Sequence, residues 1–245
     1  MSSVIDLLKS HKSIRKFTDQ KIEPELFDIL IDAGQAAATS SFLQGSTIVR
    51  ITDPRKRREI AEFAGNQPYV ETAAEFMIFC ADLKRAGNYC ETYEKPFEGD
   101  FTEHFIIATV DVALMAQSLV TAAESVGLGI CYIGGIRNNP GPVSELLELP
   151  KGVYPVFGLC LGYPDQDPEI KPRLPRSVIL KQEVYNEEGD PEAIAEYDDL
   201  ISEYYRTRTG GGHGITWSEQ VSTLLSEKSR PHMKKFLADK GFKFR

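Results

Sequence analysis

The stretch that decides the fold is EHFIIATVDVALMAQSLVTAAESVGLGICYIGG, residues 103–135. Its first part predicts one long helix over residues 103–126, because apolar and small side chains recur at helical spacing. They occur on every side of that helix, which is typical of a helix buried at the centre of a domain. Gly127 ends the helix, and residues 130–133 predict a buried strand that runs into two adjacent glycines.

Helices and strands are also predicted before and after this stretch. The predicted helices cover residues 4–10, the segment from Pro24 towards the polar run Thr39-Ser40-Ser41, and residues 54–63; the predicted strands cover residues 47–52, 76–81 and 153–161. Residues 83–102 differ from their surroundings, since they contain glycines and a proline and have no clear period. We therefore predict a mobile flap there.

The composition changes after residue 164. The prolines of the KPRLP segment at residues 171–175 predict an extended basic loop. An amphipathic helix is expected over residues 191–208, the glycine run 210–214 is expected to be flexible, and two more helices are expected near 217–228 and 231–240. Because this half lacks a strand-rich core, we expect a single domain over residues 1–245 with a C-terminal cap or arm over about 165–245.

Composition excludes several classes of protein. The net charge of −8 argues against binding to nucleic acid or to an anionic membrane. No apolar run is expected to approach the roughly 20 residues of a membrane span, and the N-terminus does not resemble a secretion signal. The histidines lack metal-ligand spacing, so no metal site is expected. Without a C-x-x-C pair, reduced and mostly buried thiols in a cytoplasmic protein are expected for Cys80, Cys90, Cys131 and Cys160.

Three polar clusters and one pair of glycines are candidate binding elements. Residues 11–15 join cations, a hydroxyl and backbone N–H groups, as a phosphate requires, although a solvated basic turn would have the same composition. The hydroxyls of residues 39–41 suit a ligand or a simple helix end. Gly134-Gly135 would let a flat ligand approach the backbone, or would form a tight turn. Lys171 and Arg173 present two cations from a stiff loop, or are ordinary surface charges.

Other common sites lack support in the sequence. No G-x-G-x-x-G motif follows a predicted strand, which argues against a Rossmann dinucleotide site. No motif supports a cysteine nucleophile or a Ser-His-Asp triad.

The order of short motifs along the chain is more specific than any one of them. The motifs are HKSIR (11–15), SSFLQ (40–44), GNQ (65–67), FCAD (79–82), AESVGLG (123–129), YIGGIRNN (132–139), FGL (157–159), KPRLP (171–175) and TWS (216–218). Together they closely resemble the group of oxygen-insensitive NADPH nitroreductases and NADPH-flavin oxidoreductases. The resemblance covers nearly the whole chain and leaves the 83–102 segment unmatched.

The resemblance implies an α+β fold, in which a mixed, mainly antiparallel sheet is wrapped by helices. It also implies an intertwined homodimer with C-terminal arms and one FMN at each end of the interface. The residues implied for FMN are His11, Lys12, Ser13, Arg15, Ser40, Ser41, Phe42, Gln67, Tyr132, Ile133, Gly134, Gly135, Lys171 and Arg173, some of them acting from the partner subunit. Arg208 and Arg230 are implied for the 2′-phosphate of NADPH.

Two positions depart from the family pattern. Lys12 replaces the usual arginine, so a planar fork becomes a point charge. After Arg208 the family tends to have a second arginine, and this chain has glycines and His213, so NADH is possible besides NADPH.

The implied function is two-electron, ping-pong hydride transfer from NADPH through FMN to nitroaromatics, quinones, chromate or free flavin. Lys171 and Arg173 would give electrostatic support, and no side chain is assigned as an obligatory acid or base. One alternative is a dedicated flavin reductase. An alternative of another class is an FMN-binding or stress-sensing protein that does not turn over.

Overall fold

The structure, a computed structural model, describes residues 3–208, 211–227 and 229–245. It divides into two compact units, one made of Met1–Asp167 with His232–Arg245 and the other of Pro168–Pro231. The last segment of the predicted arm at about 165–245 groups with the first unit. Leu237 and Phe242 explain this, since both side chains are buried in the main hydrophobic core of that unit.

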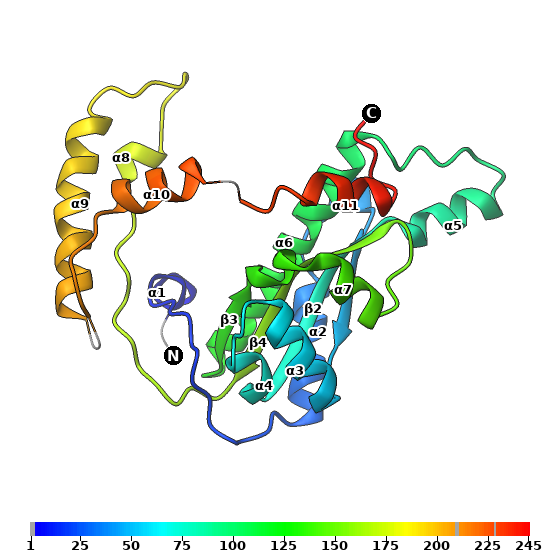
Figure 1. The fold of residues 1–245 in the computed structure, drawn as a ribbon, viewed down its shortest axis with the longest axis horizontal. Coiled ribbons are helices and arrows are strands. Elements are labelled where there is room, and N and C mark those ends of the chain that lie inside the picture. The colour runs from blue at the N-terminus through cyan, green and yellow to red at the C-terminus, as the bar shows by residue number, and fades with distance from the viewer. Residues whose placement is uncertain (1–2, 209–210, 228) are drawn as a thin grey trace. The chain divides into compact units, whose positions relative to one another are not determined.

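A four-stranded sheet forms the centre of the first unit, with the strand order β1-β2-β4-β3 (Figure 1). Its strands are β1 (Ser46–Arg50), β2 (Glu75–Asp82), β3 (Gly129–Ile133) and β4 (Val153–Gly162). All three strand pairs are antiparallel, and a parallel bridge joins Ser13 to Ile130 beside β3. Every residue of β2 is buried, as the continuous apolar run at 76–81 predicted.

Helices surround this sheet. They are α1 (Val4–Lys9), α2 (Pro24–Gln35), α3 (Pro54–Phe63), α4 (Tyr69–Thr72), α5 (Lys84–Thr92), α6 (Thr102–Ser125), α7 (Pro140–Leu146) and α11 (Met233–Asp239), with short 3₁₀ turns at Ser40–Phe42 and Gly134–Asn138. The start of α3 shows how local sequence sets a boundary. The Asp53 side chain accepts a hydrogen bond from the backbone N–H of Arg55 at 2.8 Å, and Pro54 occupies the first helical position.

Part of the predicted flap is a helix. Within residues 83–102, which showed no clear period in the sequence, Lys84–Thr92 form the helix α5. Tertiary contacts account for the helix: Leu83 is buried, its N–H donates to the Gly152 carbonyl at 2.8 Å, and Arg85 bonds to the chain around Ser46. These contacts join residues far apart in sequence, so local periodicity gives no sign of them.

Within the single chain, helix α6 is buried on one side only. Its inward side chains pack against α2 and the sheet, and the fully buried ones include Val112, Ala116 and Leu119. Ile106, Val110 and Leu114 are 48%, 49% and 45% exposed, respectively. An apolar stripe of the helix is thus left uncovered in the single chain.

By length and composition α6 is also long and apolar enough to cross a membrane, with a mean hydropathy of 1.8. The expectation of no such segment is therefore wrong by this measure, although the core helix of a globular domain meets the same criterion. Its contacts with α2 and with β1, β2 and β3 are those of a core helix.

The second unit contains α8 (Arg176–Ile179), α9 (Asp190–Thr207) and α10 (Trp217–Ser226), and Figure 1 shows α9 and α10 within it. The buried side chains of Tyr197 and Ile201 lie on α9, and the Tyr197 ring contacts Trp217 of α10 with centroids 6.3 Å apart. Thr216 caps α10 through a reciprocal pair of bonds with Glu219. Gly210 of the predicted glycine run and Lys228 of the predicted helix lie outside the described residues.

Candidate functional site

The segment that carries His11–Arg15 is fixed along β3. The N–H of Ile14 donates to the Ile130 carbonyl at 2.8 Å. A side chain at Gly129 would place its Cβ 2.6 Å from Ile14 Cγ1, so glycine permits this close approach. The candidate phosphate-binding cluster therefore lies beside the strand that leads into Gly134 and Gly135.

His11 and Lys12 each have an acidic partner. The Nδ1 atom of His11 lies 2.5 Å from Oε1 of Glu124, a residue on α6 whose side chain is 10% exposed. Lys12 Nζ lies 2.5 Å from Oδ1 of Asp167, whose side chain is 89% exposed. A surface ion pair of this kind contributes about 0–1 kcal/mol to stability. Lys12 can therefore exchange Asp167 for a bound anion at little cost in free energy. These four residues line a hollow of about 270 Å³.

Tyr69 is a polar partner of Gln67. Burial, with a contribution from Cys131, raises the pKa of Tyr69, and the positive charge of the exposed Arg15 guanidinium opposes this rise. The Tyr69 hydroxyl, which stays protonated, donates to Oε1 of Gln67 at 2.6 Å. The structure thus adds Tyr69, which the sequence analysis missed, as a hydrogen-bond partner of the predicted site residue Gln67.

Gln67 in turn lies against Gly135. A Cβ atom at Gly135 would lie 2.5 Å from Gln67 Nε2 and 2.2 Å from the Ala64 carbonyl oxygen. Glycine at this position is therefore required by packing within the protein. Gly134 is different, because its nearest neighbour would be Arg137 at 3.5 Å, which leaves room for a flat group.

Tyr132 and Ile133 precede these glycines on β3. Burial, followed by the charge of Glu124, raises the pKa of Tyr132 to about 12, so its hydroxyl is neutral at physiological pH. Ile133 is fully buried in the core. Its side chain is therefore unavailable, and a ligand at this strand end would meet its backbone.

An exposed loop formed by Ser40, Ser41 and Phe42 contacts α6 at a position away from Glu124. Ser41 and Phe42 have left-handed φ values of 49° and 55°, and the Phe42 side chain is 81% exposed. The Ser40 N–H donates to Oδ1 of Asp111 at 3.0 Å. Asp111 is 13 residues before Glu124 on α6, which corresponds to about 20 Å along the helix axis. Within one chain, this loop is therefore well separated from His11.

Asp111 is a second residue that the sequence analysis missed. It is 1% exposed, and among the described residues its Oδ2 atom has no hydrogen-bond partner, as is also true of the nearby Thr39 hydroxyl. The available signal was its position, because it is the only Asp, Glu, Lys or Arg between Glu103 and Glu124. Buried polar atoms are rarely left unpaired, so this carboxylate is suited to a donor from outside the chain.

The second unit gathers three predicted cations around α9. Lys171 Nζ donates to the Tyr205 hydroxyl at 2.6 Å, and the Arg208 guanidinium carbon lies 4.8 Å from the centroid of the same ring. Arg173 donates to the Lys171 carbonyl at 2.7 Å. The family motifs implied two different ligands for these cations, and in the structure the cations share one cluster. Arg230 has a left-handed φ of 48°, and its role stays a prediction.

A cavity of about 500 Å³ in the first unit was not predicted. It lies between the segment after β2 and the C-terminal residues, and its lining includes Lys84, Lys95, Phe97 and Lys151. None of the predicted site residues lines it, so it is separate from the hollow beside His11.

Comparison with known proteins gives a consistent result over the whole chain. Residues 8–163 match the model of the nitroreductase family, and residues 171–245 match the model of the nitroreductase family, C-terminal domain. The chain is 46% identical to the NADPH-flavin oxidoreductase of Vibrio harveyi, over 98% of each chain. It is 42% identical to the oxygen-insensitive NADPH nitroreductase of Salmonella typhimurium, over 99% of each chain.

A solved structure supports the same assignment. The NADPH:FMN oxidoreductase from Vibrio harveyi, in complex with NAD⁺, superimposes with a TM-score of 0.91 at 45% identity and 99% coverage of each chain. Family models that cover most of the chain agree with full-length relatives and with this fold. This chain belongs to the nitroreductase family.

Proposed function

We propose that this protein is an FMN-dependent NAD(P)H oxidoreductase that reduces nitroaromatics, quinones, chromate or free flavin. The observation that carries the proposal is the arrangement beside β3, where His11 and Lys12 lie near the strand that leads into Gly134, and Gln67 lies against Gly135. Relatives named for NADPH-flavin oxidoreductase, nitroreductase and chromium(VI) reductase activity support this choice of reaction.

The residues present fit FMN. His11, Lys12, Ser13 and Arg15 supply two permanent cations, a hydroxyl and an imidazole along one strand edge, and a phosphate takes such charge-assisted donors. The open position at Gly134 suits a flat ring. Ser40, Ser41 and Phe42 would contact the FMN of the partner protomer, since their loop lies about 20 Å along α6 from the His11 contact.

Bound FMN would supply the redox chemistry, taking a hydride from the nicotinamide and then passing two electrons to the acceptor in a ping-pong cycle. Lys171 and Arg173 supply positive charge that favours an anionic flavin ring. Tyr132, whose pKa is raised to about 12, keeps its proton and acts as a hydrogen-bond donor. No proton-transfer residue is assigned.

Arg208 and Arg230 are the proposed contacts of the NADPH 2′-phosphate. Arg208 is exposed, and the Tyr205 ring holds its guanidinium close to a second cation, Lys171. Two cations on one ring suit a dianionic phosphate, which favours NADPH over NADH.

We also propose a homodimer in the cytoplasm. The uncovered stripe of Ile106, Val110 and Leu114 on α6 is an apolar surface that a second copy would bury. Three of the four free thiols are buried, as suits a reducing compartment.

The visible spectrum of the purified protein tests the proposal. A flavin absorption band in the visible spectrum should bleach when NADPH is added without oxygen and return with a nitroaromatic compound. A band that NADPH leaves unchanged would favour the FMN-binding or stress-sensing alternative. A band that returns with free FMN and not with nitroaromatics would favour a dedicated flavin reductase. A colourless protein that does not take up FMN would reject the proposal.

A further inference from the structure

We propose that Arg85 is a positioning residue that holds the loop around Ser40–Phe42 in the conformation that binds FMN. The inference rests on the proposed function, because that function assigns these loop residues to FMN. It concerns a helix, α5, within the segment that the family motifs leave unmatched.

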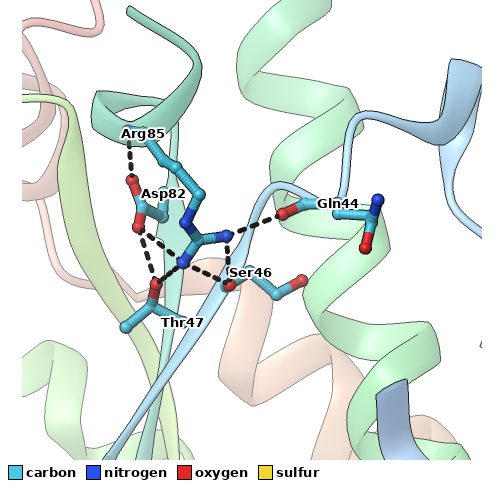
Figure 2. A network of polar contacts seen from close by, with 5 residues as sticks. All are labelled: Gln44, Ser46, Thr47, Asp82 and Arg85. Carbon is cyan, nitrogen blue, oxygen red and sulfur yellow. Dashed lines mark hydrogen bonds and ion pairs between the residues drawn. The ribbon is translucent and has the colours of Figure 1, made fainter. Parts of the chain in front are cut away.

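The Arg85 side chain forms hydrogen bonds with the residues that follow the loop, as Figure 2 shows. One terminal nitrogen, Nη1, donates to the Gln44 carbonyl at 3.2 Å and to the Ser46 carbonyl at 3.3 Å. The other, Nη2, donates to the Thr47 hydroxyl at 2.6 Å and also lies 3.3 Å from Oδ2 of Asp82. The guanidinium therefore joins α5 to Gln44, just after the loop, and to the first two residues of β1.

Asp82 and Thr47 fix the guanidinium in turn. The Thr47 hydroxyl donates to Oδ2 of Asp82 at 2.6 Å, and the Arg85 N–H donates to Oδ1 of the same carboxylate at 3.1 Å. The Asp82 side chain is 11% exposed, so this contact is partly shielded from water. A planar fork with several donors is needed to reach all these acceptors, and a lysine ammonium group cannot reproduce it.

The loop needs to be held because its backbone is strained. Ser41, Phe42 and Gln44 have φ values of 49°, 55° and 52°, in the left-handed region that residues with a side chain rarely adopt. Ser41 and Phe42 are also exposed, so side-chain burial does little to stabilise the conformation.

Contacts at the two ends of the loop oppose this strain. At the first end, the Ser40 N–H donates to Asp111 of α6. At the second, Gly45 packs against Ala108 of the same helix, and Arg85 binds the carbonyls of Gln44 and Ser46. Arg85 is a side-chain contact that comes from outside α6, so it can be removed without altering the core helix. The backbone N–H of Asp82, at the end of β2, also donates to the Gly45 carbonyl at 2.9 Å and remains in place when Arg85 is replaced.

The test compares FMN dissociation from three variant holoenzymes with that from the wild type. Arg85→Gln removes the guanidinium group. Arg85→Lys keeps the positive charge and tests whether the planar guanidinium is needed. Lys84→Gln is the matched control. Lys84 is the adjacent cation on α5, and its ammonium group bonds to Asn88 of the same helix. Release is followed by the recovery of FMN fluorescence on dilution.

Arg85→Gln and Arg85→Lys should each weaken FMN binding about ten-fold, while Lys84→Gln matches the wild type. Turnover per bound FMN should be unchanged, because the residue acts through the loop and does not touch the reacting atoms. Equal FMN affinity in all four proteins would overturn the inference. Full rescue by Arg85→Lys would also overturn it, since charge alone would then suffice.

A second substitution separates loop positioning from a general loss of stability. Asparagine adopts left-handed backbone more easily than glutamine does. Gln44→Asn should therefore restore part of the FMN affinity lost in Arg85→Gln, and an equal loss in both backgrounds would contradict the role of strain. If the wild type itself binds no FMN, the proposed function fails; if only the Arg85 effect is absent, this inference alone fails.

Discussion

The Arg208 guanidinium lies against the ring of Tyr205, with its central carbon 4.8 Å from the ring centroid. Lys171 approaches the same ring, with Nζ 5.0 Å from the centroid and bonded to the hydroxyl. One aromatic side chain of α9 thus holds two cations that are 37 residues apart in sequence. An incoming phosphate would meet positive charge that is already in place, which lowers the cost of ordering it.

Arg208→Ala should raise the Michaelis constant for NADPH by about ten-fold or more, since losing a charged contact of about 1.4 kcal/mol or more has that effect. The constant for NADH should barely change, because NADH lacks the 2′-phosphate, and turnover should hold for both. Steady-state kinetics with both donors at a fixed acceptor concentration measure this. Arg206→Ala is the control, as Arg206 is exposed on the same helix and bonds to Ser202. Equal losses with NADPH and NADH would mean that Arg208 supports its loop.

Arg15→Ala should lower the FMN content of the purified protein without unfolding it. The side chain is exposed, so its removal leaves no cavity, and a lost hydrogen bond to a charged phosphate costs about 1.5–3 kcal/mol. The flavin-to-protein ratio after gel filtration measures the effect. The adjacent cation gives the control, Lys16→Ala, which should keep its flavin. The assignment of Arg15 to the phosphate would be rejected by an unchanged ratio.

Val110→Glu combined with Leu114→Glu should convert a dimer into a monomer that has lost FMN. Both side chains are almost half exposed on α6, and a carboxylate buried at an apolar interface is strongly unfavourable. Sedimentation should give about twice the 27.4 kDa chain mass for the wild type and one chain mass for the variant. Val110→Ile keeps the surface apolar and should stay dimeric. A monomeric wild type that retains FMN would exclude a site shared between protomers.

Alkaline pH should destabilise the fold through Tyr154. Burial, partly opposed by a hydrogen bond with Thr109, raises the pKa of this 2%-exposed side chain from 10.0 to about 12. The folded state therefore keeps the proton longer, so the contribution to stability is complete below pH 10 and is lost as the pH rises through about 12. The free energy of unfolding is expected to fall by roughly 2–3 kcal/mol as the pH rises through this range.

Tyr154→Phe isolates this contribution. Loss of the hydrogen bond with Thr109 should lower the free energy of unfolding of the variant by about 1 kcal/mol at neutral pH. Between pH 10 and about 12, the stability of the variant should fall less steeply than that of the wild type. Urea unfolding at a series of pH values gives both quantities. Parallel curves for the two proteins would show that another group governs alkaline unfolding.

Much of the architecture was accessible from local patterns. The prediction of a helix over residues 54–63 matches α3, and the apolar run at 76–81 marked the buried strand β2, because capping and burial leave signals within a few residues. The glycines after β3 were also recognised, yet the reason for one of them was not. Gly135 is required by Ala64 and Gln67, which approach it from elsewhere in the chain.

The sequence by itself determined the family, the order of its elements and the groups of residues that form the candidate site, since each depends on short motifs and their spacing. Tertiary structure alone decided that α5 is a helix, that one stripe of α6 is uncovered and that Asp111 faces the Ser40 loop. It also placed His232–Arg245 in the first unit and joined Lys171 to Arg208 at one tyrosine. These features depend on contacts between distant residues, and the free energy of such contacts is set by packing and burial, which local periodicity does not encode.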